Sequence, residues 1–277
     1  MDDQEYVHRL NAMYEDVYDK ENHCCRHWTL CKSKEPVKFC FDRVKIGEKY
    51  GTTYPKILFV GLEGVRKGVA DYRIPPISRD NDNSKPSLSV YNNHYKGVRY
   101  VLSYLLAKLS NEAPPASGKK RDLSQPPYTE HLKHYCLTNL YKCAFGDPQK
   151  SVGLMHTDAM KKQCPEILFS EIEILRPDMI VIQAVAGLPE HFWERLKTRF
   201  HCNGDFVISA QRNDNTSAFR LYYDDGQPFY CIRTYHGNGF PYPDRHGGVF
   251  PSNAEYIHTE LNPILDAVVR QYAKQQP

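Results

Sequence analysis

The sequence has no long hydrophobic run: nowhere does it hold the roughly 20 consecutive apolar residues that a membrane-spanning helix needs. Its first five residues, Met1 to Glu5, are acidic and polar rather than the apolar stretch of a secretory signal. These two absences argue against a membrane helix and against export. We therefore expect a cytoplasmic protein with no membrane partner.

A large excess of charge of either sign is also missing. The 277 residues carry a formal net charge of +3, with 41% hydrophobic and 25% charged residues, which is typical of a globular protein. Such a mild charge permits a nucleic-acid partner without requiring one, because a surface that follows phosphates can be local. The length suits one large α/β domain or two small ones.

Cysteine is plentiful, with nine residues, and its distribution is uneven. A disulfide framework is not expected in a reducing cytoplasm, where clustered thiols more often bind a metal or an iron–sulfur cluster. Isolated thiols such as Cys202 and Cys231 are typical of small core side chains. The candidates for metal binding are an early group and a middle group: Cys24, Cys25, Cys31 and Cys40, then Cys136, Cys143 and Cys164.

Buried strands alternate with amphipathic helices along the chain. We predict strands over 56–61, 136–140, 179–183 and 229–235, the last of these entered through a hairpin at residues 224–226. We predict helices within the first twenty residues and over 95–109, 164–175, 189–200 and 254–273. This alternation predicts an α/β fold: a three-layer α/β/α sandwich around a short, mostly parallel sheet of four strands.

Polar residues follow three of the predicted strands, at Gly61–Arg66, Thr138–Asn139 and Thr234–Asn238. Ligands of such folds bind beyond the carboxyl ends of the strands. A carboxylate, an amide and an imidazole, from Glu63, Asn139 and His236, would therefore meet in one crevice. This set suits cleavage of an N-glycosidic bond: the carboxylate stabilises a sugar cation, the amide reads a pyrimidine edge and the imidazole receives the departing base.

These segments resemble the iron–sulfur branch of the uracil-DNA glycosylase superfamily over roughly residues 25–240. The most specific signal is a long pattern that runs from Thr138–Cys143 through Cys164–Glu166 to Glu171-Ile172 and Leu175–Pro177. Thr234-Tyr235-His236 is similar to the second catalytic motif of the family. Gly61–Gly64 stands where the first motif is found, so the resemblance implies a uracil-DNA glycosylase-like fold.

The chain departs from the family at several of these motifs. Gly237-Asn238 replaces the usual Pro-Ser or Pro-Ala, and Gly64 replaces a proline. Val65 stands where well-known members have a tyrosine that blocks bases with a 5-substituent, so a larger base would fit. The early Cys-x-x-Cys pair is broken, because Trp28 occupies its second position.

The resemblance implies roles for individual residues. Glu63, Asn139 and His236 would be catalytic, although Glu63 is also a reasonable helix cap. Substrate contacts are expected from Gly61, Leu62, Val65, Tyr91 and Asn238, with Tyr91 or His94 as the ring that stacks on a flipped base. The loop after the second motif would enter double-stranded DNA through Phe240, Tyr242 and Arg245.

The resemblance also implies a 4Fe–4S cluster that docks residues 1–54, an N-terminal helix and Cys-rich segment, onto a single domain spanning 1–277. The expected ligands are drawn from Cys25, Cys31, Cys40, Cys143 and Cys164, with Cys24 as a competitor for the early positions. A structural zinc held by His23, His27 and the same cysteines is the alternative.

The expected activity is that of a monofunctional, monomeric DNA glycosylase that excises a modified pyrimidine and leaves an abasic site. The leading substrate is a bulky 5-substituted cytosine, such as glucosylated hydroxymethylcytosine in phage DNA, because family members with antiviral activity remove it. One alternative is excision of uracil in DNA repair. The other is a non-catalytic DNA-binding or redox-sensing protein that keeps the fold.

Overall fold

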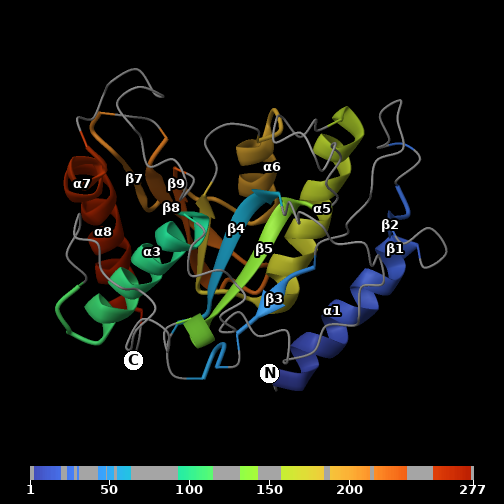
Figure 1. Ribbon diagram of the computed structural model, residues 1–277, viewed down its shortest axis with the longest axis horizontal. Helices are drawn as coiled ribbons and strands as arrows, with labels where there is room; N and C mark the ends of the chain where they lie inside the picture. The colour runs from blue at the N-terminus through green and yellow to red at the C-terminus, as the bar shows by residue number, and fades with distance from the viewer. Residues whose placement is uncertain are drawn as a thin grey trace.

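A computed structural model describes residues 3–19, 24–27, 30, 43–47, 49–52, 55–63, 93–114, 132–142, 157–183, 188–212, 215–235 and 252–275. Within them the chain is an α/β protein built on a mixed sheet of seven strands (Figure 1). The strands of this sheet are β3 (Lys45–Ile46), β4 (Ile57–Glu63), β5 (Tyr135–Tyr141), β6 (Met179–Gln183), β7 (Val207–Ser209), β8 (Ser217–Tyr222) and β9 (Pro228–Thr234). A separate small hairpin joins β1 (Tyr18–Asp19) to β2 (Cys24–Cys25).

The strand order is β3-β5-β4-β6-β9-β8-β7. The four central strands, β5, β4, β6 and β9, run parallel, and they are the strands that the hydrophobic runs predict. The predicted total of four strands is wrong, because β3 pairs antiparallel at one edge and β8 and β7 pair antiparallel at the other. These additions turn a mostly parallel sheet into a mixed one.

Helices cover both faces of the sheet (Figure 1). One face carries α1 (Asp3–Val17), α5 (Asp158–Leu175) and α6 (Phe192–Arg199). The other carries α3 (Asn93–Leu109), α7 (Asn253–Tyr256) and α8 (Asn262–Ala273), with the π-helical turn η2 (Ile257–Leu261) between the last two. A short 3-10 helix, η1 (Leu132–His134), leads into β5. The predicted helix over 254–273 is therefore interrupted by a π-helical turn, a feature often found near functional sites.

Alternation along the strands divides the interior into two cores. In β4, Leu58 and Val60 pack towards α5, whereas Ile57 and Phe59 pack towards α3 and α8. Successive side chains of a strand point to opposite faces, so a continuous apolar run in the sequence indicates a strand buried on both faces. This two-sided burial produces the three layers.

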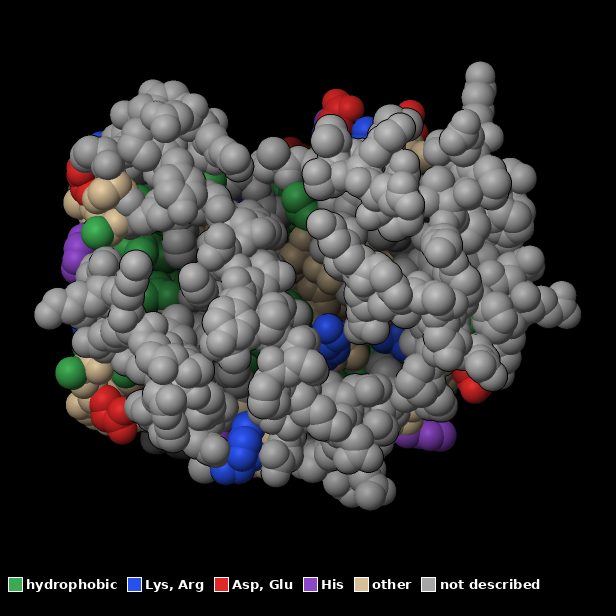
Figure 2. Space-filling model, viewed as in Figure 1, with side chains coloured by type: hydrophobic (Ala, Val, Ile, Leu, Met, Phe, Trp, Pro, Cys, Tyr) green, Lys and Arg blue, Asp and Glu red, His purple; other side chains and the backbone are tan. Residues whose placement is uncertain are grey.

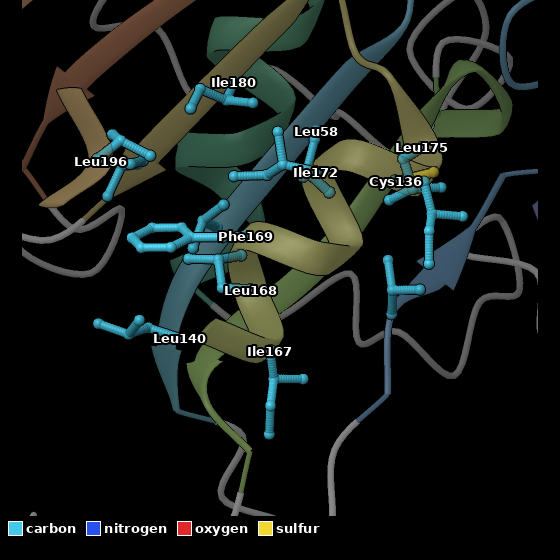
Figure 3. Close-up of a cluster of buried hydrophobic side chains, with 14 of the residues drawn as sticks. Leu58, Cys136, Leu140, Ile167, Leu168, Phe169, Ile172, Leu175, Ile180 and Leu196 are labelled. Carbon is cyan, nitrogen blue, oxygen red and sulfur yellow. The ribbon is translucent and has the colours of Figure 1, made fainter. Parts of the chain in front are cut away.

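Helix α5 is the main support of the first face. Leu168, Ile172 and Leu175 form a buried stripe with helical spacing against the sheet (Figure 3). The helix begins six residues before the predicted start, where the Thr157 hydroxyl accepts the N–H of Met160 at 3.3 Å. It ends at Arg176, a left-handed residue with φ of 46° that precedes Pro177.

Candidate functional site

The carboxyl ends of the four parallel strands bring one residue from each strand into a line across the sheet. Asn139 of β5 is paired with Gly61 of β4, and Gln183 of β6 is paired with Thr234 of β9. Gly61 and Gln183 lie one residue beyond the Val60–Ile182 pair that joins β4 to β6. We call Asn139, Gly61, Gln183 and Thr234 the strand-end row.

The side chains of the strand-end row belong to the face covered by α3, α7 and α8. Asn139, Gln183 and Thr234 each stand two residues after a side chain of that core, namely Leu137, Val181 and Ile232. Neighbouring strands lie about 4.8 Å apart. Because Gly61 has no side chain, β4 places no side chain between Asn139 and Gln183 at this position, and the two strands that carry them are about two strand spacings apart.

Gln183 was not singled out by the sequence, yet its surroundings are unusual. Its side chain is fully buried, and neither amide atom, Nε2 or Oε1, has a hydrogen-bond partner among the residues that the structure describes. Most buried polar side chains in proteins do have one, and an exception calls for an explanation such as a ligand or an ordered water. The only signal in the sequence is a polar residue that ends the run Met179–Ile182.

Thr234 is held by a buried hydroxyl hub. The phenolic oxygen of Tyr256 lies 2.8 Å from Thr234 Oγ1 and 2.8 Å from Thr216 Oγ1. Burial raises the pKa of Tyr256 to about 12, and the two threonine hydrogen bonds oppose the rise, so the phenol stays protonated at neutral pH. The Tyr235 ring also meets the Tyr256 ring edge-on, with centroids 5.4 Å apart. The residues just before His236 are thus fixed against α7.

On the opposite face of β5, a buried ion-pair network supports the strand that carries Asn139. It consists of Tyr14, Thr138, Lys142 and Glu171. Lys142 Nζ lies 2.6 Å from Glu171 Oε1 and 2.6 Å from Thr138 Oγ1, and both charged side chains are fully buried. The Thr138 hydroxyl donates to Glu171 Oε2 at 2.8 Å, and the Tyr14 hydroxyl donates to Oε1.

Burial raises the pKa of Glu171, and the Lys142 ammonium is the main group that opposes the rise. The network joins three elements distant in sequence: α1 through Tyr14, the end of β5 through Thr138 and Lys142, and α5 through Glu171. Tyr14 also accepts the N–H of Val44 at 3.0 Å, next to β3. One set of polar contacts therefore links α1 and α5 to β5, the strand that carries Asn139.

Of the five cysteines from which the cluster ligands are expected, the structure describes two, and Cys136, a further candidate by its place in the sequence, is buried in β5. Cys25 of β2 and Cys164 of α5 are both buried, on the face covered by α1 and α5. The His27 N–H donates to Cys25 Sγ at 3.4 Å, and burial raises the pKa of the free Cys25 thiol. Among the described residues no group of three or more His, Cys, Asp or Glu side chains surrounds a metal position.

The remaining predicted site residues fall into two groups: those in β4 and β5, which the structure describes, and those outside the described residues. Gly61 is buried and Leu62 and Asn139 are half-buried, while Glu63 ends β4 opposite Tyr141. The predictions that lie outside the described residues are Val65, Tyr91, His236, Asn238, Phe240, Tyr242, Arg245, Cys31, Cys40 and Cys143. Figure 2 shows Lys and Arg side chains of the described part as separate patches on the viewed face.

Comparison with known proteins adds no family: no protein-family model matches the chain, and no curated protein matches it either. None of the described helices is long and apolar enough to cross a membrane.

Proposed function

We propose that this chain is a DNA glycosylase of the uracil-DNA glycosylase type, which flips a modified pyrimidine nucleotide into the carboxyl edge of the sheet and hydrolyses its N-glycosidic bond. The observation that carries the proposal is the strand-end row. It sets an amide, Asn139, beside a glycine, Gly61, at the edge where α/β folds bind their ligands. In the sequence, Glu63 and His236 stand two residues after Gly61 and Thr234 of that row.

The chemistry of these residues fits the reaction. A carboxylate at Glu63 would orient water and stabilise the positive sugar of the transition state. The Asn139 amide, with one donor and one acceptor group, reads the edge of a pyrimidine. The imidazole of His236 would stabilise the negative charge of the departing base. Neutral side chains in the strand-end row suit a neutral base better than a charged ligand.

The proposed substrate is a cytosine with a bulky 5-substituent in double-stranded DNA, as found in phage genomes. The support is the small side chain at Val65, together with an amide at Asn139 that accepts cytosine as readily as uracil. The protein would act as a cytoplasmic monomer. Excision of unmodified uracil is the competing outcome of the same experiment.

The proposed cofactor is a 4Fe–4S cluster, with Cys25 and Cys164 among its ligands. The fit rests on two buried thiols and on the N–H hydrogen bond to Cys25 Sγ, the kind of contact that tunes cluster sulfurs. Such a cluster would tie the N-terminal segment to the domain. Elemental analysis of the purified protein tests it: iron with sulfide supports the cluster, whereas zinc without iron contradicts it.

The activity is tested by base release from duplexes that carry either uracil or glucosylated hydroxymethylcytosine, followed by alkaline cleavage at abasic sites. Glu63→Gln and Asn139→Ala should each reduce release at least tenfold. Asn262→Ala is the control: it removes an amide that accepts the Tyr100 hydroxyl at 3.0 Å, on α8 rather than at a strand end. Unchanged release by Glu63→Gln would contradict the catalytic assignment.

A further inference from the structure

Within the part of the chain that the structure describes, the buried amide of Gln183 has no hydrogen-bond partner. On one side, Gly61 has no side chain. On the other, the Thr234 hydroxyl is already paired with Tyr256 at 2.8 Å. A buried amide without hydrogen bonds destabilises the folded state, because its donor and acceptor have lost their water.

The position of this amide matches that of Asn139 on the other side of Gly61. Both residues occupy the same face of the sheet, one strand to either side of β4. Their Cα atoms are about two strand spacings apart, roughly 9–10 Å, and both side chains extend from the sheet. A flat ring placed over the glycine would thus meet an amide on each of two edges.

We propose that Gln183 is a specificity-determining residue of the base site. Its amide hydrogen-bonds to an uncharged polar group on the edge of the base that faces β6, while Asn139 reads the opposite edge. The ligand class is a neutral planar heterocycle with donors and acceptors on two edges. This inference rests on the proposed function and extends it to a second base-reading amide.

The substitution Gln183→Leu should change the stability of the free protein and the rate of base release in opposite directions. Gln183→Leu removes an unpaired polar group and keeps most of the volume, so the free protein should become more stable. The same change removes a contact to the base, so base release should become slower. A glutamine with only a structural role would not separate these effects, because its loss would lower stability.

The experiment compares thermal unfolding and base release for wild type, Gln183→Leu and a matched control, Gln227→Leu. Gln227 lies in the β8–β9 hairpin, where its Oε1 accepts Arg176 Nη2 at 2.7 Å. For Gln183→Leu we expect a rise in Tm of about 2–4 °C and a fall in kcat/KM of at least tenfold. For Gln227→Leu we expect a lower Tm and unchanged base release.

A lower Tm for Gln183→Leu would overturn the proposal, since it would show a partner within the protein. A higher Tm with unchanged kcat/KM would overturn it as well, because the amide would then contribute nothing to the base.

Thermal shifts with free uracil and free 5-hydroxymethylcytosine separate this proposal from the glycosylase activity. If wild type releases no base but is stabilised by either compound, and Gln183→Leu is not, the base site stands and only the activity fails. If neither compound stabilises wild type and no base is released, both proposals fail.

Discussion

The buried ion pair between Lys142 and Glu171 should be the most sensitive point of the fold. Both side chains are fully buried, with 2.6 Å between Lys142 Nζ and Glu171 Oε1. Glu171→Leu leaves the ammonium without its anion, and Lys142→Met leaves the carboxylate without its cation. Removing one partner of such a pair costs about 3–5 kcal/mol, a large share of the roughly 5–15 kcal/mol by which domains are stable.

The double variant Lys142→Met with Glu171→Leu separates the cost of an unpaired charge from the worth of the pair. An apolar replacement of a buried pair is often close to neutral. The double variant should therefore lose much less stability than the two single losses added together, which is a positive coupling energy in the mutant cycle. Denaturant unfolding followed by circular dichroism measures all four proteins.

Lys161→Met provides the matched control. Lys161 Nζ lies 3.2 Å from Asp158 Oδ1, but this pair is largely exposed, with 43% and 100% of the two side chains accessible. Exposed pairs are worth roughly 0–1 kcal/mol. A loss below about 1 kcal/mol in either buried single variant, equal to that of the control, would refute the reasoning. So would single losses that simply add in the double variant.

Two further substitutions test how the site is held in place. Tyr256→Phe removes the hydroxyl shared by Thr216 and Thr234 and should cost about 1–3 kcal/mol of unfolding free energy and slow base release; unchanged denaturation and release would contradict the hub. Gly47→Ala would place a Cβ 2.7 Å from the Tyr135 carbonyl oxygen. It should lower the free energy of unfolding, measured by chemical denaturation, by about 1–3 kcal/mol. A loss under about 0.5 kcal/mol would mean that the chain after β3 moves freely away from Tyr135.

The central strands could be predicted because their chemistry is local. Met179–Ile182 is an uninterrupted apolar run, which is typical of a strand covered on both faces. The edge strands give no such signal: β3 has two residues, and in β7 Val207 and Ser209 are exposed. Their pairing depends on the edges of the completed sheet, so the predicted count of four strands fell short.

The candidate site also has residues that could be predicted from the sequence and residues that could not. The rule that parallel strands end at one edge places Asn139 near Gly61, and both residues are visible in the sequence as polar or small residues after apolar runs. Gln183 could not be found in this way, because its significance lies in the absence of a partner. The Lys142–Glu171 pair is equally hidden, since 29 residues separate its members and only the packing of α5 on β5 unites them.

The most direct test of the account is base release by the wild-type protein from a duplex that carries glucosylated hydroxymethylcytosine, beside a duplex that carries uracil. The account predicts abasic sites in the first duplex and their loss in the Glu63→Gln and Asn139→Ala variants. Release from uracil alone would keep the glycosylase and contradict the proposed substrate. Release from neither duplex would contradict the central claim, and the strand-end row would then belong to a protein without this activity.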